Sequence, residues 1–210
     1  MSAFGLNQFH GKFIVLDGPE GSGKSTQMQL LRASLEAAGL DVLAVRDPGT
    51  TPIGEKIRAI LLDPAHVEMG MRCEMLLYMA ARAQMMTEII QPALDAGKVV
   101  LCDRFVSSTL AYQLGGDGMT TADIRAVAEI AIRGRWPDLT IILDMPADKS
   151  MARVQRAKDR IEQRPMAYHA QVLRNYVSQA EENPRYRIIS ADRDRDIVQA
   201  DVLKAVQSLQ

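Results

Sequence analysis

The feature that most constrains the fold is a series of short apolar runs that alternate with helical stretches. The runs are rich in Val, Ile and Leu and lack a polar residue at every second position, which is typical of parallel strands covered on both faces. Repeated strand–helix–strand units build a parallel sheet with helices on both faces. The predicted strands are residues 12–17, 41–46, 98–103, 139–144 and 186–190.

The stretches between these runs have helical patterns, and several carry end signals. Gly39 and Gly97 follow two of them, where glycine commonly ends a helix. The segments TTAD (120–123) and SADRD (190–194) offer N-cap side chains to two others. We see no internal repeat and no linker, so we expect residues 1–210 to form one α/β domain. The predicted helices are residues 23–38, 53–62, 68–96, 121–133, 147–161, 166–182 and 195–209.

Composition excludes several classes of protein. The net charge is −1, which does not favour a long nucleic-acid footprint or a membrane-binding surface. Cys73 and Cys102 show no metal-binding or redox spacing, so we expect both to be buried thiols in a reducing compartment. Neither a signal peptide nor an apolar run of about 18 residues is visible. We therefore expect a cytoplasmic protein with no nucleic-acid or membrane partner.

The stretch GPEGSGKS follows the first predicted strand and opens the first predicted helix. Its pattern is G-x-x-x-x-G-K-[ST], the phosphate-binding P-loop, in which backbone N–H groups surround a phosphate. Lys24 would add charge at the β- and γ-phosphates of ATP, and the Ser25 hydroxyl would bind Mg²⁺. The alternative is a glycine-rich turn that happens to carry a lysine. The predicted ATP-binding residues are Gly18, Pro19, Glu20, Gly21, Ser22, Gly23, Lys24, Ser25 and Thr26.

Charged side chains at the strand ends suggest where a second substrate binds. Ligand groups gather at the carboxyl edge of an open parallel sheet, and Asp17, Arg46, Asp103 and Asp144 all end predicted strands. Arg46 and Arg104 would grip an acceptor phosphate through their planar guanidinium groups, or else form surface ion pairs. Asp103 could reach the Mg²⁺ through water.

Two absences narrow the class of nucleotide-binding protein. The sequence has no N-K-x-D stretch, which disfavours a guanine-reading GTPase. The strand 98–103 is followed by Arg104 and not by the water-activating Glu that is usual in motor ATPases.

The motifs together resemble the thymidylate kinase family of bacteria, one of the P-loop nucleoside monophosphate kinases. The resemblance runs from about residue 12 to the C-terminus, through LDGPEGSGKSTQ, RDPGTTPIGEKIR, EMLLYMAARAQ, DRFVSSTLAYQ, RWPDLTIILDMP and DRIEQ. It implies a P-loop NTPase fold with a five-stranded parallel sheet and a mobile lid, in a homodimer. It also implies transfer of the γ-phosphoryl group of ATP to dTMP, with Mg²⁺, giving dTDP and ADP.

The resemblance also assigns roles to particular residues. Tyr78 matches the base-stacking ring and Arg82 the base-reading arginine, although core packing and an ion pair are their alternatives. Four residues apart on one helix, the two share a face. Arg104 matches the acceptor-phosphate arginine, Tyr112 the ring that crowds the sugar 2′ position, and Glu20 the acidic residue near the acceptor sugar and metal. The remaining predicted dTMP-binding residues are Arg46, Asp47, Ser108, Thr109 and Gln113.

The predicted lid, residues 149–164, carries six basic residues against two acidic ones. Phosphoryl transfer needs positive charge around the transferring group. The family supplies it from the P-loop or from the lid, and this P-loop has no arginine. The resemblance therefore favours Arg153, Arg156 and Arg160 as catalytic residues, together with Lys24, Glu20 and Arg104. The alternative is a solvated helix face.

The sequence departs from the family pattern at the PGTT segment, where Thr50 replaces a glycine. Threonine is costly there if the position needs a positive φ. Two rival functions remain open from the residues. One is a nucleotide-bound switch or assembly protein with no chemical acceptor. The other is a kinase for another monophosphate such as dUMP, which lacks only one methyl group of dTMP.

Overall fold

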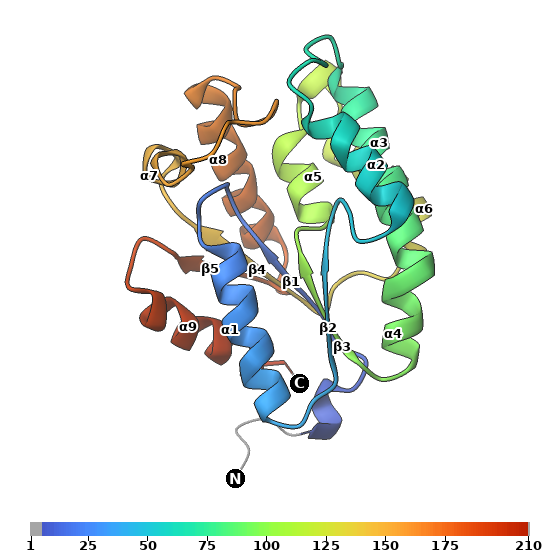
Figure 1. Ribbon diagram of the computed structural model, residues 1–210, viewed down its shortest axis with the longest axis vertical. Helices are drawn as coiled ribbons and strands as arrows, with labels where there is room; N and C mark the ends of the chain where they lie inside the picture. The colour runs from blue at the N-terminus through green and yellow to red at the C-terminus, as the bar shows by residue number, and fades with distance from the viewer. Residues whose placement is uncertain (1–5, 210) are drawn as a thin grey trace.

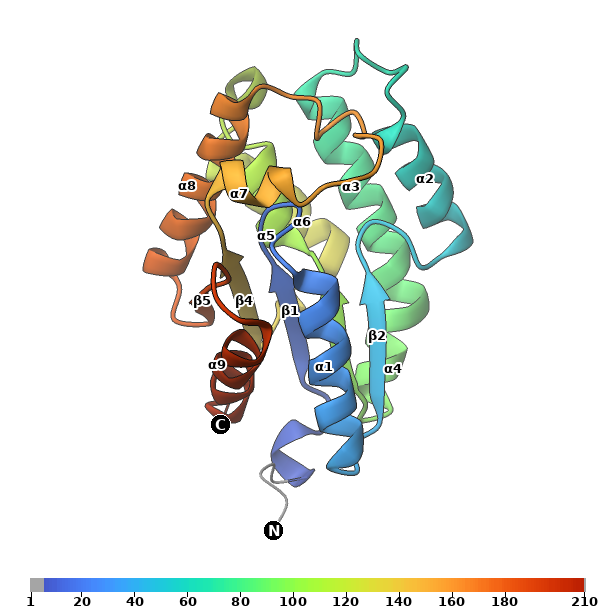
Figure 2. The same cartoon turned by 60° about the vertical axis from the view of Figure 1, so that its left-hand side comes forward.

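A five-stranded parallel sheet forms the centre of the molecule (Figures 1 and 2), in the order β2-β3-β1-β4-β5. The computed structural model describes residues 6–209. The sequence predicted all five strands, and the structure confirms them. Their bounds are Phe13–Asp17 (β1), Val42–Arg46 (β2), Val99–Asp103 (β3), Leu139–Asp144 (β4) and Tyr186–Ser190 (β5).

Helices follow the strands and cover both faces of the sheet. The α-helices are Lys24–Ala37 (α1), Pro52–Leu62 (α2), Met71–Met85 (α3), Gln91–Asp95 (α4), Val106–Tyr112 (α5), Thr121–Ile132 (α6), Ala147–Ala152 (α7), Met166–Glu182 (α8) and Arg195–Gln207 (α9). A π-helical turn, Met86–Ile90, joins α3 to α4, and short 3₁₀ turns lie at Leu6–Phe9 and Gly116–Gly118.

Alternate side chains of β1 enter opposite layers of the core. Phe13 and Val15 pack with residues of α3, α4, α5 and α6 on one face. Ile14 and Leu16 pack with residues of α1 and α9 on the other. Because both faces of a central strand are buried, the strand reads as a continuous apolar run.

The helix-end signals are mostly confirmed. Gly39 and Gly97 have φ of 88° and 81°. Thr120 forms a capping box with Asp123 at the start of α6. Asp194 precedes α9 but makes no side-chain capping bond, so the capping function predicted for that segment is wrong.

Three other expectations are corrected. The predicted helix 147–161 ends at Ala152, and the chain then runs without regular structure to Pro165. The helix α5 was not predicted from the sequence. Cys73 is exposed on α3, whereas Cys102 is buried in β3 as expected.

The strand register brings the predicted charged ends together. Arg46 pairs with Asp103 across β2 and β3, and Leu16 pairs with Asp103 across β1 and β3. The segment that follows α7 passes over this carboxyl edge towards α2 and α3 (Figure 2). Among residues 6–209, no helix has the length and apolar character needed to cross a bilayer. A single domain over residues 1–210 stays a prediction, and residues 1–5 and 210 lie outside the described part.

Candidate active site

The loop between β1 and α1 has room only for glycine at two positions. Gly18 has φ of 134°, and a Cβ atom there would lie 2.5 Å from the carbonyl oxygen of Leu143. Gly21 has φ of 73°, and a Cβ atom there would lie 2.1 Å from the carbonyl oxygen of Ser150 on α7. A side chain at residue 21 would therefore collide with backbone. With this backbone, residue 21 therefore cannot be an arginine.

Lys24 folds back over this loop. Its Nζ donates to the carbonyl oxygens of Gly18 at 3.0 Å and Pro19 at 2.7 Å. Burial, reinforced by the charge of Arg104, lowers the pKa of Lys24, and the carboxylates of Glu20 and Asp103 act in the opposite direction. The side chain of Lys24 is thus buried and bound to the loop backbone, at the wall of the cavity described below.

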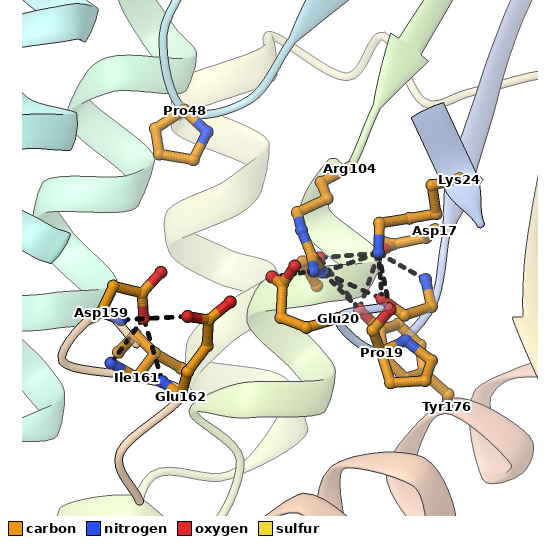
Figure 3. A network of polar contacts seen from close by, with 12 residues as sticks. Asp17, Pro19, Glu20, Lys24, Pro48, Arg104, Asp159, Ile161, Glu162 and Tyr176 are labelled. Carbon is orange, nitrogen blue, oxygen red and sulfur yellow. Dashed lines mark hydrogen bonds and ion pairs between the residues drawn. The ribbon is translucent and has the colours of Figure 1, made fainter. Parts of the chain in front are cut away.

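A buried carboxylate at the end of β1 ties the loop to helices far along the chain. The two oxygens of Asp17 accept hydrogen bonds from Ser107 Oγ at 2.6 Å, Ser108 Oγ at 2.8 Å and Tyr176 OH at 2.7 Å. Asp17 also accepts from the backbone N–H of Gly18 at 2.8 Å. These bonds fix α5 and α8 against the start of the loop (Figure 3).

Arg104 points into the same network (Figure 3). It has φ of 70°, and its Nη1 donates to the carbonyl oxygen of Gly18 at 3.1 Å and to Ser108 Oγ at 3.0 Å. Its Nη2 pairs closely with Glu20. Burial alone would raise the pKa of Glu20, but the charges of Arg104 and Lys24 outweigh it and lower the pKa to about 2. The Glu20 carboxylate is therefore held ionised by two neighbouring cations.

These residues open onto a cavity of about 460 Å³ at the carboxyl edge of the sheet. The predicted site residues that line it are Glu20, Gly21, Gly23, Lys24, Ser25, Thr26, Arg46, Asp47, Tyr78, Arg82, Asp103, Arg104, Ser108, Thr109, Tyr112, Gln113, Arg153 and Arg156. Gly18, Pro19, Ser22 and Arg160, which were also predicted, are not among the lining residues.

One wall of the cavity is built around a buried ion pair. Arg82 on α3 is 1% exposed, and its Nε lies 2.5 Å from Asp47 Oδ2. The guanidinium also donates to Thr109 Oγ1 at 3.2 Å and to the carbonyl oxygen of Phe105 at 3.0 Å. Burial raises the pKa of Asp47, although the charge of Arg82 opposes the rise. The ion pair that was the alternative interpretation of Arg82 is therefore present, at the cavity surface.

Aromatic rings flank this pair. Tyr78 lies half-buried on α3 at the cavity, and burial raises the pKa of its hydroxyl. Tyr112 at the end of α5 is buried, and the Arg104 guanidinium lies 5.4 Å from the centre of its ring. Gln113 follows, and its Nε2 donates to Glu74 Oε1 at 2.7 Å. The wall thus offers two rings and a cation within one cavity.

The outer rim of the cavity is formed by the loop after β2. Arg46 Nη2 lies 2.9 Å from Glu55 Oε1. Arg46 therefore forms an exposed ion pair, which was the alternative to phosphate binding, and it also lines the cavity. Thr50 has φ of 68°, which is costly for a β-branched residue. Its hydroxyl donates to the carbonyl oxygen of Arg46 at 3.0 Å, and this bond offsets part of the strain.

The predicted lid contributes two of its three predicted arginines to the cavity. Arg153 and Arg156 are exposed and line it. Arg156 also forms a double hydrogen bond with Glu162, at 2.8 and 2.7 Å. Arg160 instead is buried and pairs with Glu74 on α3. In this structure Arg160 therefore does not line the cavity.

Sequence reasoning missed several residues of this region. Arg58 on α2 lines the cavity and donates to the carbonyl oxygen of Pro48 at 3.2 Å. It stands inside the quoted segment RDPGTTPIGEKIR, so a basic residue in a family motif was the available signal. Asp17 was noted only as a strand end, and no local pattern marked Glu74 or Tyr176.

Comparison with known proteins identifies the family. The model of the Thymidylate kinase family matches residues 16–202. The chain is 43% identical to the thymidylate kinase of Halothermothrix orenii, over 94% of this chain and 97% of that protein. It is 45% identical to the thymidylate kinase of Pelotomaculum thermopropionicum, over 95% of this chain and 94% of that one.

A solved structure agrees with these sequences. The crystal structure of thymidylate kinase from Ehrlichia chaffeensis superposes with a TM-score of 0.77 at 30% identity, covering 94% of this chain and 99% of that one. A family match over most of the chain, with the same fold and a P-loop at the cavity, leaves one assignment: the chain belongs to the thymidylate kinase family.

Proposed function

We propose that this protein transfers the γ-phosphoryl group of ATP to the 5′-phosphate of dTMP, giving dTDP and ADP. The observation that carries the proposal is that Lys24 and Arg104 open onto one cavity with Tyr78 and Arg82. A phosphate-binding loop and a base-sized aromatic wall share this space, so a donor and a nucleotide acceptor can meet. A nucleotide switch with no acceptor would not require that wall.

Each group has a role in the proposed reaction. The loop and Lys24 hold the β- and γ-phosphates of ATP, and Arg104 holds the acceptor phosphate in line with them. Tyr78 stacks on thymine, and Arg82, fixed by Asp47, donates to a base carbonyl. Tyr112 excludes a ribose 2′-hydroxyl by its bulk.

Charge on the transferring group requires further cations. Arg153 and Arg156 of the lid face the cavity and would stabilise the charge spread over the phosphoryl oxygens. Glu20, held ionised by Arg104 and Lys24, positions Arg104 and lies near the acceptor sugar. A closed lid over this cavity would exclude water and limit hydrolysis of ATP.

We propose Mg²⁺ as the cofactor, held by Ser25 and by Asp103 directly or through water. The fit is supported by Asp103 Oδ1, a buried carboxylate oxygen with no hydrogen-bond partner among the described residues. When bound, Mg²⁺ would neutralise the charge that develops on the phosphate oxygens. No group of three or more His, Cys, Asp or Glu side chains is gathered for a metal within residues 6–209. Few protein ligands suit Mg²⁺, which keeps waters and phosphate oxygens in its shell.

We also propose that the protein is a cytoplasmic homodimer. Two adjacent helices support the dimer, since Leu76 on α3 is 53% exposed and Ile130 on α6 is 81% exposed. A second copy packed over both helices would remove these side chains from water. The unpaired cysteines Cys73 and Cys102 are consistent with a reducing compartment. Light scattering of Ile130→Glu against the unaltered protein tests the dimer, which the variant should weaken.

The reaction is tested by measuring ADP formation from ATP and Mg²⁺ with no acceptor, dTMP, dUMP, the ribose form of TMP, or AMP. We expect strong stimulation by dTMP, little by the ribose form and none by AMP. In Arg104→Ala, the loss should appear chiefly in the use of dTMP. Equal rates with and without every acceptor would refute the proposed transfer, and unchanged dTMP kinetics in Arg104→Ala would refute its phosphate role.

A further inference from the structure

A buried carboxylate on α3 joins two parts of the cavity. One is the wall with Tyr78, Arg82, Tyr112 and Gln113, called here the acceptor wall, and the other is the predicted lid, residues 149–164. Glu74 has an exposed fraction of 0% and lies one helical turn before Tyr78. One of its oxygens accepts from Gln113 Nε2 at 2.7 Å. The other pairs closely with Arg160 and accepts from Arg164 Nη2 at 2.7 Å. One side chain therefore touches both the cavity wall and the segment that follows α7.

Further bonds fix the same end of that segment. Arg160 Nε donates to the carbonyl oxygen of Leu61 on α2 at 2.9 Å. Arg164 Nη1 donates to Tyr168 OH at 2.5 Å, and Tyr168 OH donates to the carbonyl oxygen of Tyr112 at 2.8 Å. Residues 160–164 are thus attached to α2, α3 and the end of α5.

This fixed end in turn holds an arginine that faces the cavity. The backbone N–H groups of Ile161 and Glu162 both donate to Asp159 Oδ1 at 3.0 Å, which forms a tight turn (Figure 3). Glu162 is buried in this turn and accepts both hydrogen bonds from Arg156. Arg156 itself is exposed and lines the cavity. Its position therefore depends on where the turn is attached.

We infer that Glu74 is a positioning residue, which anchors the lid turn through Arg160 and Arg164 so that Glu162 presents Arg156 to the cavity. Arg160 then acts as an anchor and not as a cation on the transferring phosphoryl group. The contact with Gln113 gives the acceptor wall the same anchor. This inference adds a positioning residue to the proposed phosphoryl transfer, and it rests on that proposed function.

The kinetic test uses Glu74→Gln, which keeps the shape of the side chain but leaves two arginines without their counter-charge. A misplaced lid arginine weakens binding of the transition state more than binding of ATP, so kcat for dTMP should fall on the order of tenfold. The KM for ATP should stay within about twofold. Glu129→Gln on α6 is the control. Among the described residues, Glu129 accepts one hydrogen bond, from Trp136 Nε1, and it does not line the cavity, so kcat should stay unchanged.

Arg164→Gln is a second variant, because it leaves the buried pair of Glu74 and Arg160 intact. It should lower kcat in the same direction by a smaller factor and should fold normally. A role that was only structural would lower thermal stability in both variants without this split between kcat and KM. Unchanged kcat in both variants would overturn the inference.

Limited trypsin digestion tests the anchor without any assay of activity. Arg153, Arg156 and Lys158 are exposed, whereas Arg160 is buried in the same segment. The unaltered protein should be cleaved within 153–158 and spared at Arg160, and Glu74→Gln should add cleavage at Arg160. Cleavage at Arg160 in the unaltered protein, or none in the variant, would overturn the inference. If the proposed reaction itself is wrong, dTMP would not stimulate ADP formation by the unaltered protein.

Discussion

The acceptor wall and the lid both carry arginines to one cavity, but Arg82 in the wall and Arg153 in the lid are held differently. In the wall, Arg82 is buried against Asp47 and Thr109, so its position is fixed by packing and hydrogen bonds. In the lid, Arg153 is exposed at the end of a short helix. A fixed cation suits recognition of one base, whereas a mobile cation can arrive after the substrates have bound. If the proposed function holds, base recognition and phosphoryl transfer use arginines that differ in how many contacts hold them.

We expect the largest effect on kcat from a change at Lys24, which lines the cavity shared by the wall and the lid. Lys24→Ala should lower kcat by at least about a thousandfold with every acceptor, because the charge at the transferring phosphate is lost. Steady-state ADP formation measures the effect. A loss confined to dTMP would place Lys24 on the acceptor side and break the comparison.

Arg82→Ala tests the rigid wall. The change leaves the buried Asp47 carboxylate without its cation, so the free energy of unfolding should fall by about 3–5 kcal/mol. Urea denaturation measures that fall, and dTMP turnover should be lost with it. A fall below about 1 kcal/mol would show that the wall is not held by this pair.

Arg153→Ala tests the lid. Because the side chain is exposed and forms no ion pair recorded among residues 6–209, the free energy of unfolding should change by less than about 0.5 kcal/mol. The kcat for dTMP should nevertheless fall by about 10- to 100-fold. If Arg153→Ala lowered the free energy of unfolding as much as Arg82→Ala and left kcat unchanged, Arg153 would be a structural residue and not a catalytic one.

The smallest effect is expected at the rim, where Arg46 and Glu55 are exposed. Glu55→Gln should lower the free energy of unfolding by less than about 1 kcal/mol. A hydrogen bond from the Thr50 amide, followed by those from Arg46, lowers the pKa of Glu55 below its usual 4.5. The stabilisation is therefore present above pH 4.5 and lost as the pH falls through the lowered pKa. Urea unfolding of both proteins from pH 7 to 3 should show the difference shrinking, and a constant difference would contradict this.

The sheet could be predicted because its strands are buried on both faces and therefore read as apolar runs. The helix α5 could not, since Ser107, Ser108 and Thr109 are weak helix formers that form no apolar stripe. Their side chains instead reach Asp17 and Arg82. Lys and Arg favour helices locally, so the sequence predicted that the lid helix continues beyond Ala152. Instead, buried contacts of Ile161 and of the Glu74–Arg160 pair hold this segment without a helix.

The P-loop motif and the family resemblance predicted residues of the loop and the aromatic wall that line the cavity, but not the residues that fix them. Glu74 meets Arg160, and Asp17 meets Tyr176, across long separations in the sequence. Such buried pairs depend on tertiary packing, so no local spacing marks them. Exposure of Cys73 was missed for a related reason, since composition does not show which face of α3 meets the core.

The strand order has a consequence for how the chain is made. The loop-bearing strand β1 lies between β3 and β4, and β4 begins only at Leu139. Leu139 lies about two-thirds of the way along the 210 residues. Until the ribosome has synthesised β4, one edge of β1 has no strand to pair with. An apolar strand with a bare edge invites pairing with other chains. We therefore expect fragments that stop before β4 to aggregate, and nascent chains to need protection until β4 has emerged.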